Sequence, residues 1–228
     1  MEKVSMILLS GGIGQRMKLN IPKQFLHIAG KPMIVHVLER VDKVDEIGEI
    51  IIPTPANFIE TTEEIIRTHR LEKPIKVVSG GKTRQESTYI GLKHCQYDRV
   101  LIHEAVRPFV KREEFLALIH NGDRNAIFGL DIPFTVLQGG EFITGILQRD
   151  QLINIQLPQI FDRQLLLEAH QMAEEENAEF TEDASLLFYY KNTPIRVLRG
   201  TEYNIKITKP IDRKLAEIIY KEYILGEE

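Results

Sequence analysis

Cysteine, tryptophan and long apolar runs are scarce in this chain. It contains one cysteine, Cys95, and no tryptophan among 228 residues. A single cysteine excludes an internal disulfide and any metal site built from several cysteines. The apolar run at residues 4–9 is too short to span a membrane, and no signal-peptide cleavage pattern follows it. We therefore expect a cytoplasmic protein.

An excess of charge of either sign is also missing. Lys and Arg number 29 against 33 Asp and Glu, which gives a net charge of −4, and no long basic tract is present. This composition argues against general binding to nucleic acid or to an anionic membrane. If the protein binds phosphate groups, the positive charge must be gathered locally.

Apolar runs alternate with segments of helical period along the chain. The runs predict strands at 4–9, 47–52, 75–78, 99–103, 126–132 and 194–198. The periodic segments predict helices at 32–41, 58–69, 83–92, 111–120, 164–176, 182–190 and 210–223. Residues 133–156 alternate around a Gly139-Gly140 turn, which predicts a β-hairpin excursion. We expect an α/β fold whose mostly parallel sheet carries helices on both faces.

Three polar loops, at residues 10–16, 80–87 and 104–107, directly follow predicted strands. Ligands of open parallel sheets bind beyond the carboxyl ends of the strands, so we expect these loops to meet at one edge. Glycines let the backbone approach a phosphate, and neighbouring Arg and Lys side chains add positive charge. The three loops together indicate a nucleoside-triphosphate site, although either glycine-rich loop taken alone is equally compatible with an ordinary turn.

Neither glycine-rich loop fits a familiar phosphate-binding signature. The dinucleotide fingerprint needs a glycine where this chain has Met17, and the P-loop needs one where it has Lys76. The sequence therefore disfavours an NAD dehydrogenase and a mononucleotide ATPase.

Seven ordered segments resemble the cytidylyltransferases that form CDP-activated polyols. This group includes 2-C-methyl-D-erythritol 4-phosphate cytidylyltransferase and ribitol-5-phosphate cytidylyltransferase. The matching segments lie at residues 10–17, 22–26, 80–87, 103–109, 156–161, 181–185 and 200–208. The resemblance implies a single Rossmann-like domain over 1–228, with 133–156 as a projecting β-arm through which a homodimer forms. It also implies a reaction in which CTP and a polyol phosphate give a CDP-polyol and pyrophosphate, with Mg²⁺.

The resemblance also implies roles for individual residues. It assigns catalysis to Arg16, Lys23 and Lys206. It assigns CTP binding to Ser10, Gly11, Gly12, Gly14, Gly80, Gly81, Arg84 and Ser87. Acceptor binding falls to Glu104, Arg107, Arg149, Thr181 and Lys206, and Glu104 is also the candidate metal ligand. Arg149 lies on the arm, so it would reach the active site of the partner subunit.

Several of these residues also have a purely structural interpretation. Ser87 could be a hydroxyl on a helix surface, and Arg107 could form an ion pair with Glu104. Thr181 could cap the helix that follows it, and Lys206 could be an exposed strand charge. His103 has no metal-ligand partner on its own element, so we expect it to pack at a strand end rather than to bind zinc.

Four departures from the family pattern fall on the acceptor side. Glu104 and Glu182 stand in place of Asp, Leu157 stands in place of Thr, and residues 135–138 lack the expected Asp-Thr pair and Lys. The sequence therefore supports the identity of the nucleotide, CTP, better than the identity of the acceptor.

The choice of acceptor stays open. Gly11-Gly12 and residues 105–109 slightly favour a ribitol 5-phosphate-like acceptor. The alternatives are 2-C-methyl-D-erythritol 4-phosphate of isoprenoid biosynthesis, or another alditol or sugar phosphate used for a cell-surface polysaccharide. A nucleotidyltransferase that joins another nucleotide to a sugar 1-phosphate, and a nucleotide-binding protein without turnover, are the competing classes.

Overall fold

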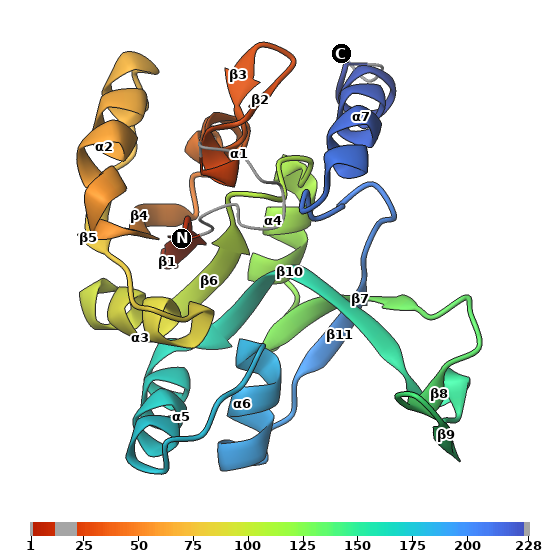
Figure 1. The fold of residues 1–228 in the computed structure, drawn as a ribbon. Helices are drawn as coiled ribbons and strands as arrows, with labels where there is room; N and C mark the ends of the chain where they lie inside the picture. The colour runs from red at the N-terminus through yellow and green to blue at the C-terminus, as the bar shows by residue number, and fades with distance from the viewer. Residues whose placement is uncertain (1, 12–21, 226–228) are drawn as a thin grey trace.

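A seven-stranded sheet forms the centre of the molecule (Figure 1). The computed structural model describes residues 2–11 and 22–225. The strands are β1 (Val4–Leu9), β4 (Ile47–Thr54), β5 (Ile75–Ser79), β6 (Arg99–Glu104), β7 (Ala126–Asp131), β10 (Ile153–Asp162) and β11 (Arg196–Arg199). Their order in the sheet is β11-β7-β10-β6-β1-β4-β5, and β10 runs antiparallel to both of its neighbours while the other pairs are parallel. The predicted mostly parallel sheet is confirmed.

Helices cover both faces of this sheet, as predicted. They are α1 (Met33–Asp42), α2 (Ile59–Thr68), α3 (Arg84–His94), α4 (Arg112–Ile119), α5 (Arg163–Glu175), α6 (Asp183–Lys191) and α7 (Pro210–Ile219). In β1, Met6 and Leu8 pack in the core cluster of α1 and α4, whereas Ile7 and Leu9 pack in that of α3, α5 and α6. Because successive strand residues point to opposite faces, burial on both faces requires the continuous apolar run seen in the sequence.

The C-terminal helix packs on a short hairpin that the sequence did not predict. Strands β2 (His27–Ile28) and β3 (Lys31–Pro32) pair with each other, and two residues are too few to show an alternating pattern. Ile28 shares a buried cluster with Ala216 and Ile219 of α7. The predicted helix at 210–223 ends at Ile219 and continues as a wider π-helical turn, Tyr220–Ile224.

The predicted excursion at 133–156 divides into two parts. Strands β8 (Leu137–Gly139) and β9 (Ile143–Ile146) pair with each other as an arm, but the chain from Ile153 onward enters the central sheet as β10. The sequence missed β10 because Pro158 argues against a central strand. A register shift in the pairing with β7, between Gln156 and Gln159, accommodates this proline.

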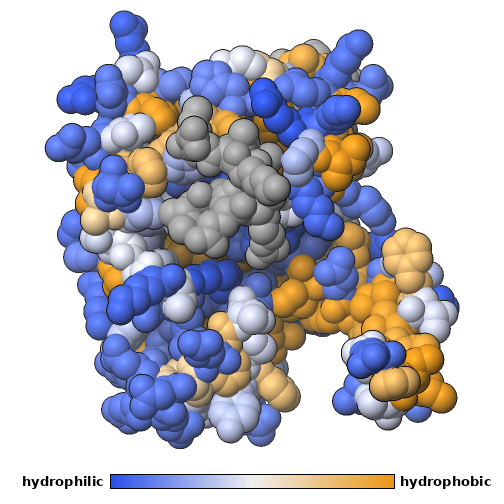
Figure 2. Space-filling model, viewed as in Figure 1, coloured by the Kyte–Doolittle hydropathy of each residue, from blue (hydrophilic) through white to orange (hydrophobic). Residues whose placement is uncertain are grey.

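The arm projects from the body and carries an apolar surface (Figures 1 and 2). Phe134, Phe142, Ile143 and Ile146 are each at least 70% exposed. A contiguous apolar surface of this kind is typical of a protein–protein contact.

Among the described residues, no helix is long and apolar enough to cross a bilayer.

Candidate functional site

The loops that follow β1, β5 and β6 meet at one pocket of about 380 Å³. Its lining includes Ser10, Gly11, Lys23, Gln24, Gly81, Lys82, Thr83, Arg84, Ser87, Glu104, Lys206 and Thr208. The carboxyl ends of parallel strands share one edge of a sheet, and this edge is where the sequence placed the ligand. The predicted convergence of the three loops is therefore present in the structure.

Eight of the predicted site residues line this pocket, and four other described ones do not. Gly80 precedes the lining residue Gly81, and Arg107 lies with Lys206 in a neighbouring cavity of about 650 Å³. Thr181 lies in a third cavity, which shares Thr83 and Arg84 with the central pocket. Arg149 is on the arm, where its guanidinium lies 3.4 Å from the Pro133 carbonyl. Gly12, Gly14 and Arg16 lie outside the described residues.

Two polar groups that line the central pocket have no partner among the described residues. Gln24 Nε2 donates to the Ser10 carbonyl at 2.7 Å. Ser10 Oγ and Gln24 Oε1 are both buried, and neither has a hydrogen-bond partner among the residues that the structure describes. Buried polar groups normally find partners, so this part of the pocket is suited to a hydrogen-bonding ligand. Sequence reasoning placed Gln24 in a matching segment but gave it no role.

The Gly80-Gly81 loop is braced by the first turn of α3. Gly80 N donates to the Thr54 carbonyl at 2.7 Å, and Gly81 N donates to Ser87 Oγ at 3.1 Å. The same hydroxyl donates to the Thr83 carbonyl at 2.9 Å. Ser87 is 5% exposed, so its interpretation as a helix-surface hydroxyl is wrong.

Gly81→Ala is expected to weaken binding of CTP, the nucleotide that the family resemblance implies, about tenfold with little change in melting temperature. A Cβ at this position would overlap Glu86 Cβ, which is the root of its side chain and cannot swing away. The loop backbone must therefore shift, and a shift of this kind displaces groups that face the ligand. The measurement is the KM for CTP. Gly140→Ala, where a Cβ meets nothing within 4 Å, is the control. Equal KM values for the two variants would show that the loop geometry is unimportant.

Three cationic groups surround the Glu104 carboxylate beside the pocket. Its carboxylate oxygens lie 2.8 Å from Lys206 Nζ, 3.4 Å from Arg84 Nε and 3.8 Å from Arg107 Nε. Burial alone would raise the pKa of Glu104, but Lys206 and Arg84 hold that pKa below its usual value. Glu104 therefore stays ionised and holds Lys206 in place. The interpretation of Lys206 as an exposed strand charge is wrong, because Lys206 lies outside any strand and is paired with Glu104. The ion pair between Arg107 and Glu104 is present, though long.

Arg84 extends this cluster into the core. Its guanidinium lies 2.7 Å from Asp183 Oδ2 and 2.8 Å from Glu182 Oε1. Asp183 and His170 are each 1% exposed, and His170 Nε2 lies 3.1 Å from Asp183 Oδ1. Burial by itself would raise the pKa of Asp183, but Arg84 and His170 hold it well below the usual range. The sequence assigned Arg84 to nucleotide binding but did not predict its ion pair with the buried Asp183.

Two structural interpretations from the sequence can be checked directly. His103 is fully buried against Phe115, and burial lowers the pKa of its imidazole to about 4, so it packs as predicted and is neutral at pH 7. Thr181 is not the cap of α6, because Glu182 occupies the N-cap and its side chain accepts from Asp183 N.

Within residues 2–11 and 22–225, no group of three or more His, Cys, Asp or Glu could hold a metal ion.

The whole chain resembles known cytidylyltransferases. It matches the family model IspD, 2-C-methyl-D-erythritol 4-phosphate cytidylyltransferase, over residues 4–222. Curated relatives with that description from Halalkalibacterium halodurans and from Clostridium botulinum strain Langeland are 34% and 36% identical. The alignments cover 96% of this chain in both cases, and 97% and 98% of those proteins.

Solved structures give the same result. The crystal structure of 4-diphosphocytidyl-2C-methyl-D-erythritol synthase from Anaerococcus prevotii superposes with a TM-score of 0.84 and 27% identity, covering 96% of this chain and 99% of that one. These names favour the methylerythritol alternative, and the slight preference for a ribitol-phosphate acceptor and for a polysaccharide pathway is not supported. The chain belongs to the IspD family of 2-C-methyl-D-erythritol 4-phosphate cytidylyltransferases.

Proposed function

We propose that this protein transfers CMP from CTP to 2-C-methyl-D-erythritol 4-phosphate and releases pyrophosphate. The observation that carries the proposal is the meeting of three strand-end loops at one pocket, with Lys23 and Lys206 both at its wall. The names of the relatives supply the nucleotide and the acceptor. Lys206 also lines the neighbouring cavity with Arg107, so it can face both substrates at once.

The chemistry demands positive charge rather than a strong base. The acceptor phosphate is already largely dianionic at neutral pH, because the second pKa of a phosphate monoester is about 6. One of its oxygens attacks the α-phosphorus of CTP, a P–O bond forms, and the bond to the β-phosphate bridging oxygen breaks as pyrophosphate leaves. Repulsion between the two anions and the charge of the leaving group are the barrier, and preplaced cations lower it. Lys23 and Lys206 supply such cations, and Arg16 is the further candidate.

We propose that a magnesium ion accompanies CTP, although the candidate protein ligand, Glu104, is already surrounded by Lys206, Arg84 and Arg107. Among the described residues, Glu104 is the one carboxylate that lines the central pocket. Mg²⁺ commonly takes one or two carboxylates together with substrate phosphate oxygens. We propose that CTP carries most of the coordination and that Glu104 supplies the protein ligand. The bound ion would neutralise charge on the triphosphate.

We also propose that the apolar arm forms a homodimer and that Arg149 acts in the partner's site. Arg149→Ala and Lys23→Ala should each be nearly inactive alone. After the two inactive proteins are mixed and allowed to exchange subunits, activity should return to about a quarter of the wild-type value. The reason is that half of the dimers are mixed, and each mixed dimer holds one site with both residues intact. Absence of recovery, with exchange verified by native mass spectrometry, would place Arg149 outside the partner's site.

The nucleotide assignment is tested by measuring pyrophosphate release with each of the four nucleoside triphosphates. We expect CTP to exceed UTP, ATP and GTP by at least about a hundredfold, since a site that hydrogen-bonds a base rejects bases lacking those groups. Faster turnover with another nucleotide and a sugar 1-phosphate would support the competing enzyme class. CTP binding without release from any acceptor would support a nucleotide-binding protein.

A further inference from the structure

We propose that Gln85 is a positioning residue that holds the loop of Thr181, a residue to which the family resemblance gives a role in acceptor binding. The proposal rests on the proposed function, because the role of Thr181 in binding the acceptor comes from the same family resemblance. Gln85 itself lies in the first turn of α3, directly after the loop that lines the nucleotide pocket.

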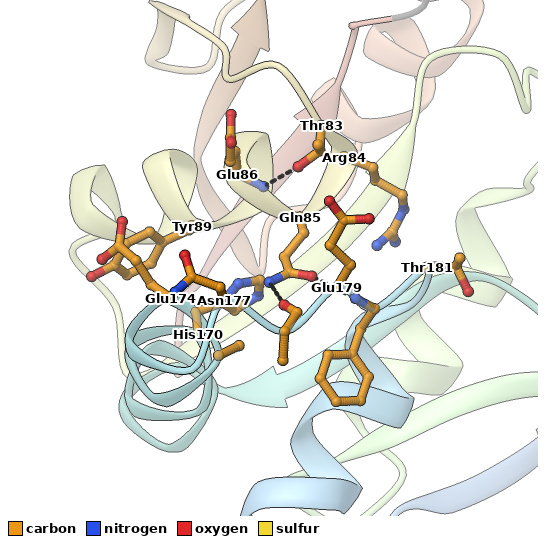
Figure 3. A pocket seen from close by; sticks show the side chains of 13 residues that line it. Thr83, Arg84, Gln85, Glu86, Tyr89, His170, Glu174, Asn177, Glu179 and Thr181 are labelled. Carbon is orange, nitrogen blue, oxygen red and sulfur yellow. Dashed lines mark hydrogen bonds between the residues drawn. The ribbon is translucent and has the colours of Figure 1, made fainter.

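Gln85 bonds to two backbone groups of one short segment. Its Oε1 accepts from Phe180 N at 2.7 Å, and its Nε2 donates to the Ala178 carbonyl at 3.0 Å. Figure 3 shows the side chain reaching from α3 to this segment, with Thr181 beyond it. An amide is the group that can accept and donate in this way at once.

The segment has few other attachments: Ala178 N donates to the Ala173 carbonyl at 2.9 Å, and the Phe180 ring packs against Tyr189 and Tyr190. Residues 178–182 lie between α5 and α6 and belong to no helix or strand. Arg84, one position before Gln85, holds the far end through Glu182 and Asp183. Fixing an irregular backbone is entropically unfavourable, so side-chain contacts of this kind determine whether it has one conformation.

Thr181 sits between the two attachments and is itself unpaired. It is exposed, and in the described part of the chain its hydroxyl makes no hydrogen bond. A hydroxyl held by its neighbours and left without a partner is available to a ligand. Gln85 should therefore affect the acceptor through Thr181, whereas the nucleotide loop keeps its own bonds through Ser87.

The first test measures the Phe180 amide by hydrogen exchange. Gln85→Met keeps the length of the side chain and removes both bonds, and Gln85→Glu keeps only the bond from Phe180 N. We expect exchange at Phe180 to accelerate at least about tenfold in Gln85→Met and to change little in Gln85→Glu. Gln171→Met, at an exposed position of α5, is the control. Unchanged exchange in Gln85→Met would overturn the proposed attachment, whatever reaction the protein catalyses.

The second test separates the two substrates in steady-state kinetics. Loss of two hydrogen bonds is expected to raise the KM for methylerythritol phosphate about tenfold in Gln85→Met, with the KM for CTP within twofold of wild type. The acceptor KM of Gln85→Glu should lie between the values of the wild type and of Gln85→Met. Adding Gln85→Met to Thr181→Val should change the acceptor KM less than about twofold, because both act through one contact. An equal rise in both KM values, or none, would overturn the positioning role. A wild-type protein that does not turn over the acceptor would overturn the proposed function instead.

Discussion

Replacing Lys23 with methionine is expected to lower kcat by two to three orders of magnitude while the protein stays folded. Lys23 lies in a short 3₁₀ helix, Lys23–Phe25, is 9% exposed and reaches the central pocket. Its ammonium donates to the Thr208 carbonyl at 3.1 Å, so its position is set before the substrates bind. Removing one preplaced donor from a site of developing negative charge lowers kcat about a hundredfold to a thousandfold.

A second lysine provides the matched control for this substitution. Lys31 lies eight residues along the chain and pairs with Glu39 at 2.7 Å on a half-exposed surface. Lys31→Met removes the same charge outside the pocket, so kcat should stay within about twofold of wild type. Circular dichroism and melting temperature report whether each variant is folded. Near-normal turnover of a folded Lys23→Met protein would reject the catalytic role of Lys23.

Asp183→Asn is expected to destabilise the fold by about 3 kcal/mol at neutral pH, because removing one partner of a buried ion pair leaves the other charge uncompensated. For a chain of this size, the melting temperature should fall by about 6–12 °C. This destabilisation is at the low end of the range for buried ion pairs, because Arg84 keeps its ion pairs with Glu182 and Glu104.

The pH dependence of this effect follows from the lowered pKa of Asp183. A carboxyl whose pKa is lower in the folded state stabilises the protein above its unfolded pKa, which is about 3.9 for Asp. That stabilisation is lost as the pH falls from there towards the folded value. The gap in melting temperature between wild type and Asp183→Asn should therefore shrink below about pH 4. A gap that is constant with pH would show that the charge of Asp183 is not what stabilises the fold.

An exposed pair gives the control for the stability measurement. Asp123 lies 2.9 Å from Arg196, and both side chains are at least half exposed. Pairs of this kind contribute about 0–1 kcal/mol, so Asp123→Asn should shift the melting temperature by no more than a few degrees.

Elements with a strong local pattern were predictable from the sequence. Strands β1, β4 and β6 each contain a continuous apolar run, at residues 6–9, 50–52 and 100–102, because both faces of the sheet are buried there. The loops after β1 and β6 follow from sheet topology. Strand β10 was not predictable, because Pro158 interrupts the pattern and its accommodation depends on pairing with β7.

Residues whose partners come from another element were hidden from sequence reasoning. Asp183 and His170 meet only because α5 packs on α6, and no spacing rule predicts that contact. Gln85 bonds to backbone groups, which carry no sequence signature. Eight of the motif residues could be placed at the pocket from the sequence, but the contacts that hold them could not.

The central claim is tested most directly by pyrophosphate release from CTP and Mg²⁺, with 2-C-methyl-D-erythritol 4-phosphate and ribitol 5-phosphate in parallel. We predict turnover with the methylerythritol phosphate and at least about a hundredfold lower kcat/KM with ribitol 5-phosphate. Preferred turnover of ribitol 5-phosphate, or measurable CTP binding with no release from either acceptor, would contradict the proposed function.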